Sequence, residues 1–177
     1  MDENSSLEEL MDTCGLDVMH TAMFYMRDPQ SAQDVFQEVF YRVWRWRDTF
    51  RGESSIKTWI LRITVNVCQS ALRKPFFRKE QAAGTDPWAE GWAFSAPKES
   101  EPEPDRLEER IALQQQLFCM PVKYREVLVL YYLEDLQVEE IAGILALPSG
   151  TVRTRLQRGK VRLLKAFAGK EDEEHER

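Results

Sequence analysis

The sequence is poor in the residues that build disulfide frameworks and metal sites. Its 177 residues include only three cysteines, Cys14, Cys68 and Cys119, and only two histidines. The cysteines are odd in number, widely spaced and not followed by nearby histidines, which argues against a disulfide framework and a structural zinc site. We therefore expect buried thiols in a reducing compartment rather than a redox switch.

Long hydrophobic runs are also lacking. No apolar stretch approaches the roughly 20 residues that a membrane span requires, and the first ten residues are too acidic for a signal peptide. The sequence thus predicts a cytoplasmic protein with no direct membrane insertion.

Catalytic motifs are missing as well. We find no glycine-rich phosphate loop, no histidine beside a credible nucleophile, and no carboxylates at metal-binding spacing. The expectation is a protein that is not an enzyme and needs no cofactor and no metal.

Positive charge is scarce overall but concentrated in two places. The formal net charge is −6, yet residues 41–79 carry ten Lys or Arg against two acids, and residues 149–168 carry six against none. The acidic excess lies elsewhere, including the tail at 171–176. Blocks of charge decide partners more than totals do, so two basic segments, the first rich in aromatics, favour nucleic-acid binding.

The N-terminal half has the periodicity of a helical bundle. Apolar residues between Ala32 and Trp46 recur three and four apart, which predicts an amphipathic helix begun by a Ser31 cap. A polar loop follows at 48–55, and Ser54 or Ser55 can cap a second long helix. The apolar pattern at 7–26 predicts one or two more helices, with Gly15 a weak point between them.

The C-terminal half reads as further helices. Residues 105–117 and 122–133 predict two of them, and 136–153 has the layout of a helix-turn-helix, with Ser149 as a cap and a second helix to about Phe167. The fold class is therefore all-α, with two small helical domains joined by a flexible linker, the C-terminal one a helix-turn-helix. The expected division is 1–75, a linker at 76–104, 105–168 and an acidic tail at 169–177.

Aromatic residues punctuate the expected linker. Trp88 and Trp92 are spaced as on a short helix, and three phenylalanines accompany them. Exposed aromatics often mark a docking surface, but they can equally pack back on the domains. Both alternatives stay open.

Two long stretches resemble one known family. The segments Asp34-Val-Phe-Gln-Glu-Val-Phe-Tyr-Arg-Val-Trp44, Phe50-Arg-Gly-Glu-Ser-Ser-Ile-Lys-Thr-Trp59 and Arg62-Ile-Thr-Val-Asn66 resemble region two of bacterial extracytoplasmic-function sigma factors. The helix-turn-helix resembles region four of the same family. The resemblance thus covers both ends of the chain.

The resemblance implies partners and roles for individual residues. The partners are the RNA polymerase core, through its beta-prime clamp helices and beta flap, promoter DNA, and an anti-sigma factor that in this family is frequently membrane-bound. Core docking would use Asp34, Gln37, Glu38, Arg42 and Arg45. Reading and melting of the minus-ten element would use Arg47, Asp48, Phe50, Arg51, Gly52, Ser54, Ser55, Lys57, Arg62 and Asn66, with Phe50 and Trp59 as a pocket wall. The minus-thirty-five element would be read by Ser149, Thr151, Arg153, Thr154, Arg155 and Arg158.

The function that follows is an alternative sigma factor, which binds core polymerase, recognises both promoter elements and promotes DNA melting. Two other classes compete with it. A stand-alone helix-turn-helix regulator would explain residues 137–164 but not the Gln37-Glu38 helix or the loop from Phe50 to Trp59. A protein-binding adaptor would explain the linker aromatics but not the basic second helix.

Overall fold

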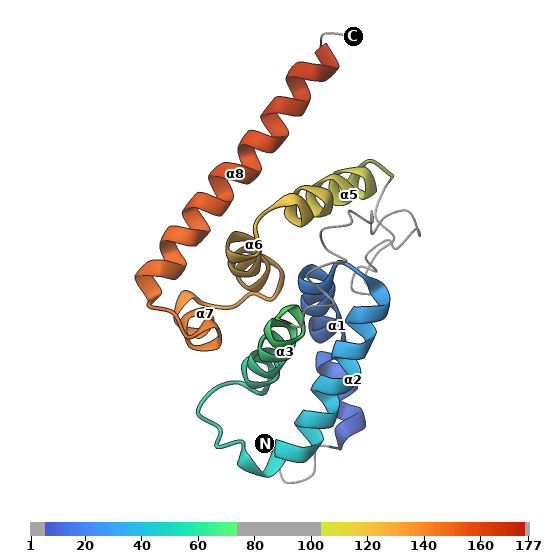
Figure 1. Ribbon diagram of the computed structural model, residues 1–177, viewed down its shortest axis with the longest axis vertical. Coiled ribbons are helices and arrows are strands. Elements are labelled where there is room, and N and C mark those ends of the chain that lie inside the picture. Colours follow the sequence, from blue (N-terminus) through green and yellow to red (C-terminus); the bar gives the residue numbers. More distant parts are fainter. Residues whose placement is uncertain (1–5, 74–103, 176–177) are drawn as a thin grey trace.

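The structure is a computed structural model that describes residues 6–73 and 104–175, with side chains described over 6–73 and 111–167 (Figure 1). Within these ranges every regular element is a helix, which confirms the all-α prediction. The N-terminal part holds α1 (Leu7–Met26), α2 (Pro29–Trp46), a short 3-10 turn η1 (Arg47–Thr49) and α3 (Ile56–Leu72). The C-terminal part holds α5 (Pro104–Cys119), α6 (Val122–Leu128), a π-helical turn η2 (Val129–Leu133), α7 (Val138–Leu145) and α8 (Ser149–His175).

α1 is one continuous helix, which resolves the alternative left open by the sequence. Ser6 and Glu9 form a capping box at its start, and Arg27, at φ 60°, ends it in a left-handed conformation. Gly15 does not interrupt the helix but is buried within it. A Cβ at Gly15 would be 3.6 Å from the Phe36 ring, which is ordinary contact. The glycine therefore lies where α1 and α2 pack, not at a break.

α2 begins earlier than expected, and its cap is a different residue. Asp28 is the N-cap, its carboxylate accepting from the Ser31 amide at 2.6 Å, and Pro29 occupies the first turn. The prediction that Ser31 is the cap was wrong. Proline is favoured in the first turn of a helix because backbone amides there have no carbonyl partner within the helix. The absence of its N–H group therefore costs no hydrogen bond.

The N-cap of α3 is Ser55, one of the two caps that the sequence allowed. The Ser55 hydroxyl accepts from the Thr58 amide at 3.0 Å. Helices α1, α2 and α3 pack on one another around Val18, Val39, Ile60 and Leu61, which are almost inaccessible to solvent. Burying such side chains stabilises a fold by about 1.5–3 kcal/mol each.

The cysteines follow the prediction in part. Cys14 and Cys68 are buried, as expected, and burial raises the pKa of both thiols. Cys119 is exposed, so its expected burial was wrong. It lies on the outer side of the last turn of α5, while Leu117 and Phe118 beside it point into the core.

The C-terminal part differs from expectation at three points. The helix expected over 122–133 changes to a π turn after Leu128. Ser149 is the first residue of α8, and the Pro148 carbonyl rather than the Ser149 side chain receives the Thr151 amide at 2.9 Å. α8 also continues to His175, past the end expected near Phe167, because the glutamates in the sequence that follows favour helix.

The two parts of the chain lie against each other, with α7 beside α3 and α6 near α1 (Figure 1). One buried cluster runs through both: Leu130, Ile141, Ile144 and Val152 share it with residues of α1, α2 and α3. The expected linker at 76–104, with its aromatics, lies almost wholly outside the described residues, and Pro104 begins α5. The domain boundaries at 75, 104 and 168 stay predictions.

Candidate nucleic-acid and polymerase interfaces

The first half of α2 presents polar side chains on its outer face. Asp34 and Gln37 are exposed, and Glu38 is half-buried. Arg42 lies one turn after Glu38, and its Nε donates to Glu38 Oε1 at 2.7 Å. Such an i,i+4 pair contributes only about 0.3–0.5 kcal/mol. The four residues thus form a surface that a partner can engage at small cost.

The second half of α2 carries an exposed group of aromatic and basic residues. Tyr41, Trp44 and Trp46 are 53%, 51% and 41% exposed. The Arg42 guanidinium lies 5.6 Å from the Trp46 ring, and that of Arg47 lies 6.0 Å from Trp44. Trp46 therefore lies on the surface rather than in the core. Aromatic faces next to cations suit a polyanion with stackable bases.

The loop after α2 keeps its polar residues outside and one aromatic inside. Arg45, Arg47, Asp48 and Arg51 are exposed, and Gly52 has φ 71°, a conformation that favours glycine. The Phe50 and Trp59 rings are half-buried, with centroids 5.4 Å apart. Their contact ties the loop to α3, as a structural wall would require.

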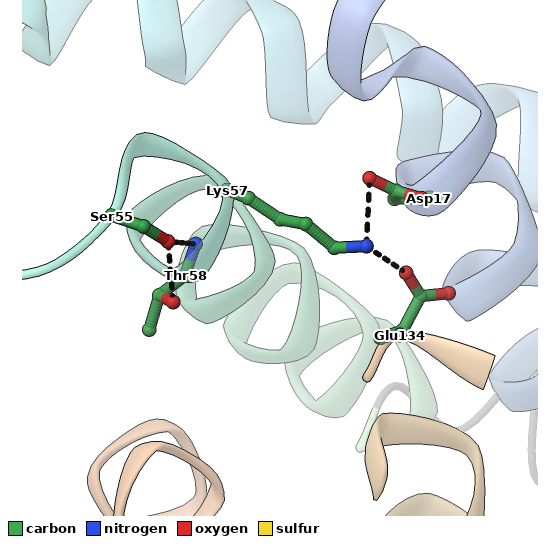
Figure 2. A network of polar contacts seen from close by, with 5 residues as sticks. All are labelled: Asp17, Ser55, Lys57, Thr58 and Glu134. Carbon is green, nitrogen blue, oxygen red and sulfur yellow. Dashed lines mark hydrogen bonds and ion pairs between the residues drawn. The ribbon is translucent and has the colours of Figure 1, made fainter. Parts of the chain in front are cut away.

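Residues of α3 are not equally available to DNA. Arg62 and Asn66 are exposed, whereas Lys57 is partly covered. The Lys57 Nζ lies 3.1 Å from Asp17 Oδ2 and 3.2 Å from Glu134 Oε2 (Figure 2). Burial lowers the pKa of Lys57, but the two carboxylates outweigh it and raise this pKa overall. The predicted phosphate contact is thus a lysine already paired with two acids.

The start of α8 forms a basic concavity together with α6. Thr151, Thr154, Arg155 and Arg158 line a hollow of about 350 Å³ with Gly150 and two residues that the sequence reading missed, Lys123 and Tyr124. Burial raises the pKa of Tyr124, but Lys123, Arg158 and Arg162 together lower it below its usual value, which reports the positive potential there. Lys123 and Tyr124 precede α8 by some 25 residues, so only the packing of α6 on α8 could reveal them.

Two predicted base readers of α8 already have acidic partners. Arg153 Nη2 donates to Glu139 Oε1 at 2.8 Å, and both side chains are largely exposed. Arg155 Nη1 donates to Glu126 Oε1 at 2.9 Å, and this pair is mostly buried. The exposed Arg153–Glu139 pair contributes little and can be exchanged for a DNA contact. The Arg155–Glu126 pair cannot, because breaking it would leave the buried Glu126 unpaired.

Over residues 6–73 and 111–167, whose side chains the structure describes, no three His, Cys, Asp or Glu side chains gather as a metal site would require. In that same part of the chain, no helix combines the length and apolar character needed to cross a bilayer.

Family comparisons match both parts of the chain. Residues 10–75 match the model described as "Sigma-70 region 2", and residues 110–163 match "Sigma-70, region 4". The chain is 34% identical to the "ECF RNA polymerase sigma factor SigW" of Bacillus subtilis over 76% of this chain and 74% of that protein. It is 36% identical to the "ECF RNA polymerase sigma-E factor" of Escherichia coli K12, over 72% and 69%.

Solved structures agree on the fold. The sigma factor RpoE in its complex with the anti-sigma factor NepR, from Bartonella quintana, has a TM-score of 0.70 at 20% identity, over 91% of this chain and 95% of that one. CnrH in complex with the cytosolic domain of CnrY has a TM-score of 0.63 at 20% identity, over 92% and 88%. At this identity the likeness concerns the fold alone.

Sigma factors are transcription initiation factors rather than enzymes, and a stand-alone regulator would not account for region two. On the matches to both regions in order and on the identity to SigW and sigma-E, the chain belongs to the extracytoplasmic-function sigma factors of the sigma-70 family and is an alternative sigma factor of RNA polymerase.

Proposed function

We propose that the two regions divide the work of promoter recognition. Region two (residues 10–75) docks on core polymerase through the outer face of α2 and reads the minus-ten element with the loop after it. Region four (residues 110–163) reads the minus-thirty-five element with the start of α8. The observation that carries this division is that the predicted contacts gather, in each region, on one accessible surface backed by a buried core.

Core docking is supported by the charge and exposure of α2. Asp34, Gln37 and Glu38 lie on its outer face, opposite the buried Val35, Val39 and Val43. Removing a charge from this face therefore changes the surface without opening the core. Arg42 and Arg45 extend the same face toward the loop. We infer that the beta-prime clamp helices of the polymerase take up this face.

Reading of the minus-ten element is supported by the loop. Taking a base out of its stack costs a few kcal/mol, so polar groups must compensate for it. The exposed Asp48, Arg51 and Gly52 and the nearby Ser54 surround the Phe50–Trp59 contact, and Arg62 and Asn66 follow on α3. Arg47 and Lys57 are the remaining cations for phosphate, and Ser55 fixes the first turn of α3.

Reading of the minus-thirty-five element is supported by the basic concavity. A recognition helix contacts base edges with its N-terminal part and phosphates with its flanks. Arg153, Thr154 and Arg158 are exposed on the first turns of α8, with Ser149 and Thr151 half-buried before them. Lys123 supplies a further cation from α6. We assign it, with Arg158, to the phosphate backbone.

Two further partners belong to the proposal. The solved relatives named above are complexes with anti-sigma factors, so we propose that an anti-sigma factor binds this chain too and holds it inactive. The beta flap of the polymerase would take region four. The site of action is that of the polymerase, the cytoplasm.

Run-off transcription tests the proposal. The full chain, purified core polymerase and genomic templates from the host are combined, and the 5′ ends of the transcripts are mapped. We expect initiation at defined starts only when both proteins are present. A chain that binds DNA but gives no initiation with core would contradict the proposed division and favour a regulator.

A further inference from the structure

The carboxyl ends of α1 and α5 lie next to each other. The Phe24 and Phe118 rings stack with their centroids 5.3 Å apart, which places the last turns of the two helices side by side. Arg27 is the C-cap of α1, and Cys119 is the last residue of α5. Cys119 is the exposed one of the three cysteines, so its thiol is open to reagents from solvent.

Arg125 of α6 points at the same end of α5 from the interior. Its Nη1 donates to the Phe118 carbonyl at 2.9 Å, and the residue is only 1% exposed. The helix dipole favours a cation at a carboxyl end, which accounts for this bond. It does not account for Nη2, which is buried and has no hydrogen-bond partner within the described part of the chain. Arg27 repeats the pattern, with a buried Nε that none of the described residues engages.

Neither guanidinium forms an ion pair with a side chain that the structure describes. Glu126 is the acid next to Arg125 in the sequence, but its two oxygens accept from Tyr25 and Arg155, both at 2.9 Å. A buried donor of a charged group is costly to leave unpaired, and such a donor in a native structure calls for a partner. The end of α5 therefore offers two unpaired N–H groups and lacks an anion to accept from them.

Cys119 is close enough to supply that anion. Burial lowers the pKa of Arg27, and a charge on Cys119 opposes this shift. Burial and the nearby Arg27 lower the pKa of Arg125 to about 9, and Cys119 is among the groups that oppose the shift, after Tyr25 and Glu126. A negative charge at the Cys119 side chain is thus within electrostatic reach of both guanidiniums.

We propose that Cys119 is a modification site for hydrogen peroxide, and that Arg27 and Arg125 bind the oxyanion that oxidation produces there. In the first step the sulfur attacks one peroxide oxygen. An S–O bond forms, the O–O bond breaks, and the leaving hydroxide takes the thiol proton as water. The sulfur loses two electrons and the peroxide gains them. A second peroxide converts the sulfenic acid to a sulfinate in the same way, and its two oxygens match in number the two unpaired N–H groups.

This site was not expected from the sequence, which favoured buried thiols over a redox role. That expectation assumed burial of all three cysteines, and the exposure of Cys119 removes its premise for this residue. The site goes beyond the proposed function and does not depend on it.

A carboxylate in place of the thiol tests the anion site without an oxidant. Cys119→Asp carries the charge and two oxygens of a sulfinate, and Cys119→Asn is the neutral control of the same size. Urea denaturation of the full chains at neutral pH compares them. At an ordinary helix end the dipole makes the anionic variant the less stable one. We expect the reverse here, a higher urea midpoint for Cys119→Asp.

The same comparison is repeated in two arginine variants. Arg27→Gln should remove the advantage of the aspartate, because it removes one of the two cations. Arg73→Gln, at an exposed arginine that ends α3, is the matched control and should leave the advantage intact. An aspartate variant no more stable than the asparagine variant, or an advantage that survives Arg27→Gln, would overturn the anion site.

Mass spectrometry follows the oxidation itself. The full chain is treated with hydrogen peroxide, the remaining thiols are blocked with N-ethylmaleimide in denaturant, and the oxidised fraction of each cysteine is read from its peptide. We expect Cys119 to oxidise at least about tenfold faster than the buried Cys14 and Cys68. We also expect Arg27→Gln to slow sulfinate formation at Cys119 by at least about twofold, and Arg73→Gln to leave it unchanged. Equal rates at the three cysteines, or equal rates at Cys119 in the two arginine variants, would overturn the modification site.

Discussion

Regions two and four differ in how they are held together. Each helix of region two starts at a side-chain cap, namely Ser6, Asp28 or Ser55, and the three helices pack mainly on one another. Region four divides its apolar residues between two clusters. Tyr124 and Leu128 pack with Leu117 and with Phe24 of α1, while Ile141 and Val152 belong to the cluster of region two.

Region two therefore has a hydrophobic core of its own, whereas part of the core of region four is formed by packing on region two. A module that packs on its neighbour in this way changes in stability when the neighbour leaves. This makes the contact between the regions a place where partners can act, since a ligand shifts an equilibrium only by its differential affinity for the two states. The predictions below test this comparison, from the largest expected effect to the smallest.

Core truncation in each region should show whether the two regions unfold as one unit. Ile60 and Ile141 are both fully buried. We expect Ile60→Ala and Ile141→Ala each to lower the free energy of unfolding by about 2–5 kcal/mol, because each leaves a cavity. Urea denaturation followed by circular dichroism measures this. A single transition that both variants shift supports a shared core, and two separate transitions, one for each variant, would break the comparison.

Overpacking between α6 and α8 of region four should destabilise the chain. A Cβ at Gly159 would already be 3.0 Å from the Leu128 Cδ1 atom, whereas at Gly150 nothing lies within 4 Å. We expect Gly159→Leu to cost about 1–3 kcal/mol and to lower the thermal midpoint. Gly150→Leu is the matched control in the same helix and should change it far less. Equal midpoints for the two variants would mean that α6 and α8 are not packed this closely.

Loss of a predicted base reader should act through one promoter element. We expect Arg153→Ala to weaken use of the minus-thirty-five element by about 1–3 kcal/mol, since its Glu139 pair is exposed and easily replaced. Lys160→Ala, on an exposed position of the same helix, should have a smaller effect. Run-off transcription on wild-type and upstream-mutated templates measures it. If Arg153→Ala loses equally on both templates, the residue does not read this element.

The packing of region four on region two should loosen as pH rises. Burial, together with the nearby Asp17 carboxylate, raises the pKa of Glu134 to about 8, although Lys57 opposes the shift. The charged groups that face it are Asp17 of α1 and Lys57 of α3, with the Cys14 thiol also near. Because Glu134 binds its proton more tightly when the two regions pack together than when it is exposed to water, the stabilisation of this packing is full below the ordinary carboxyl pKa. It is lost as the pH rises through about 8.

Small-angle scattering between pH 6 and 9 measures this change. We expect the radius of gyration to grow with pH. The ratio of chains with packed regions to chains with separated regions should fall by at most about tenfold per pH unit. Glu134→Gln removes the titrating carboxyl and should give a flat profile. An unchanged slope in that variant would assign the pH response to another group.

Reversal of one charge on region two should give the smallest change. We expect Glu38→Lys to weaken core binding by about 1 kcal/mol, because it turns an attractive surface charge into a repulsive one and breaks a weak pair with Arg42. Folding should be nearly unaffected. Titration of labelled chain with core measures it, with Asp12→Lys on the exposed side of α1 as the control. Equal affinity of both variants would remove Glu38 from the docking surface.

Features that depend on residues close together in the sequence were predicted best. The apolar period of α2 and the Ser55 cap need only neighbours within one or two turns, and both are confirmed in the structure. The Asp28 cap was missed because Ser31 is also a favoured capping residue, although the Pro29 that follows Asp28 is itself favoured in a first turn. The end of α8 was misplaced because its acidic residues were read as a tail, while the same residues also form helix.

The candidate sites show the same division. The sequence located the basic loop and the recognition helix, since both are blocks of charge on a periodic pattern. It could not show that Lys57 is paired with Glu134, 77 residues away, or that Tyr25 meets Glu126. It also missed Lys123 and Tyr124 in the basic concavity, because nothing local to them indicates α8.

The amino-acid sequence by itself determined the helices, the family and the two basic surfaces, because hydrophobic period, capping residues and charge blocks act over short distances along the chain. Only the tertiary structure decided which cations are free. Lys57 and Arg155 meet buried acids, whereas Arg45 is exposed to solvent. Whether a charge is available to DNA depends on which distant side chain the fold brings within about 3–4 Å, and no short-range pattern fixes that distance.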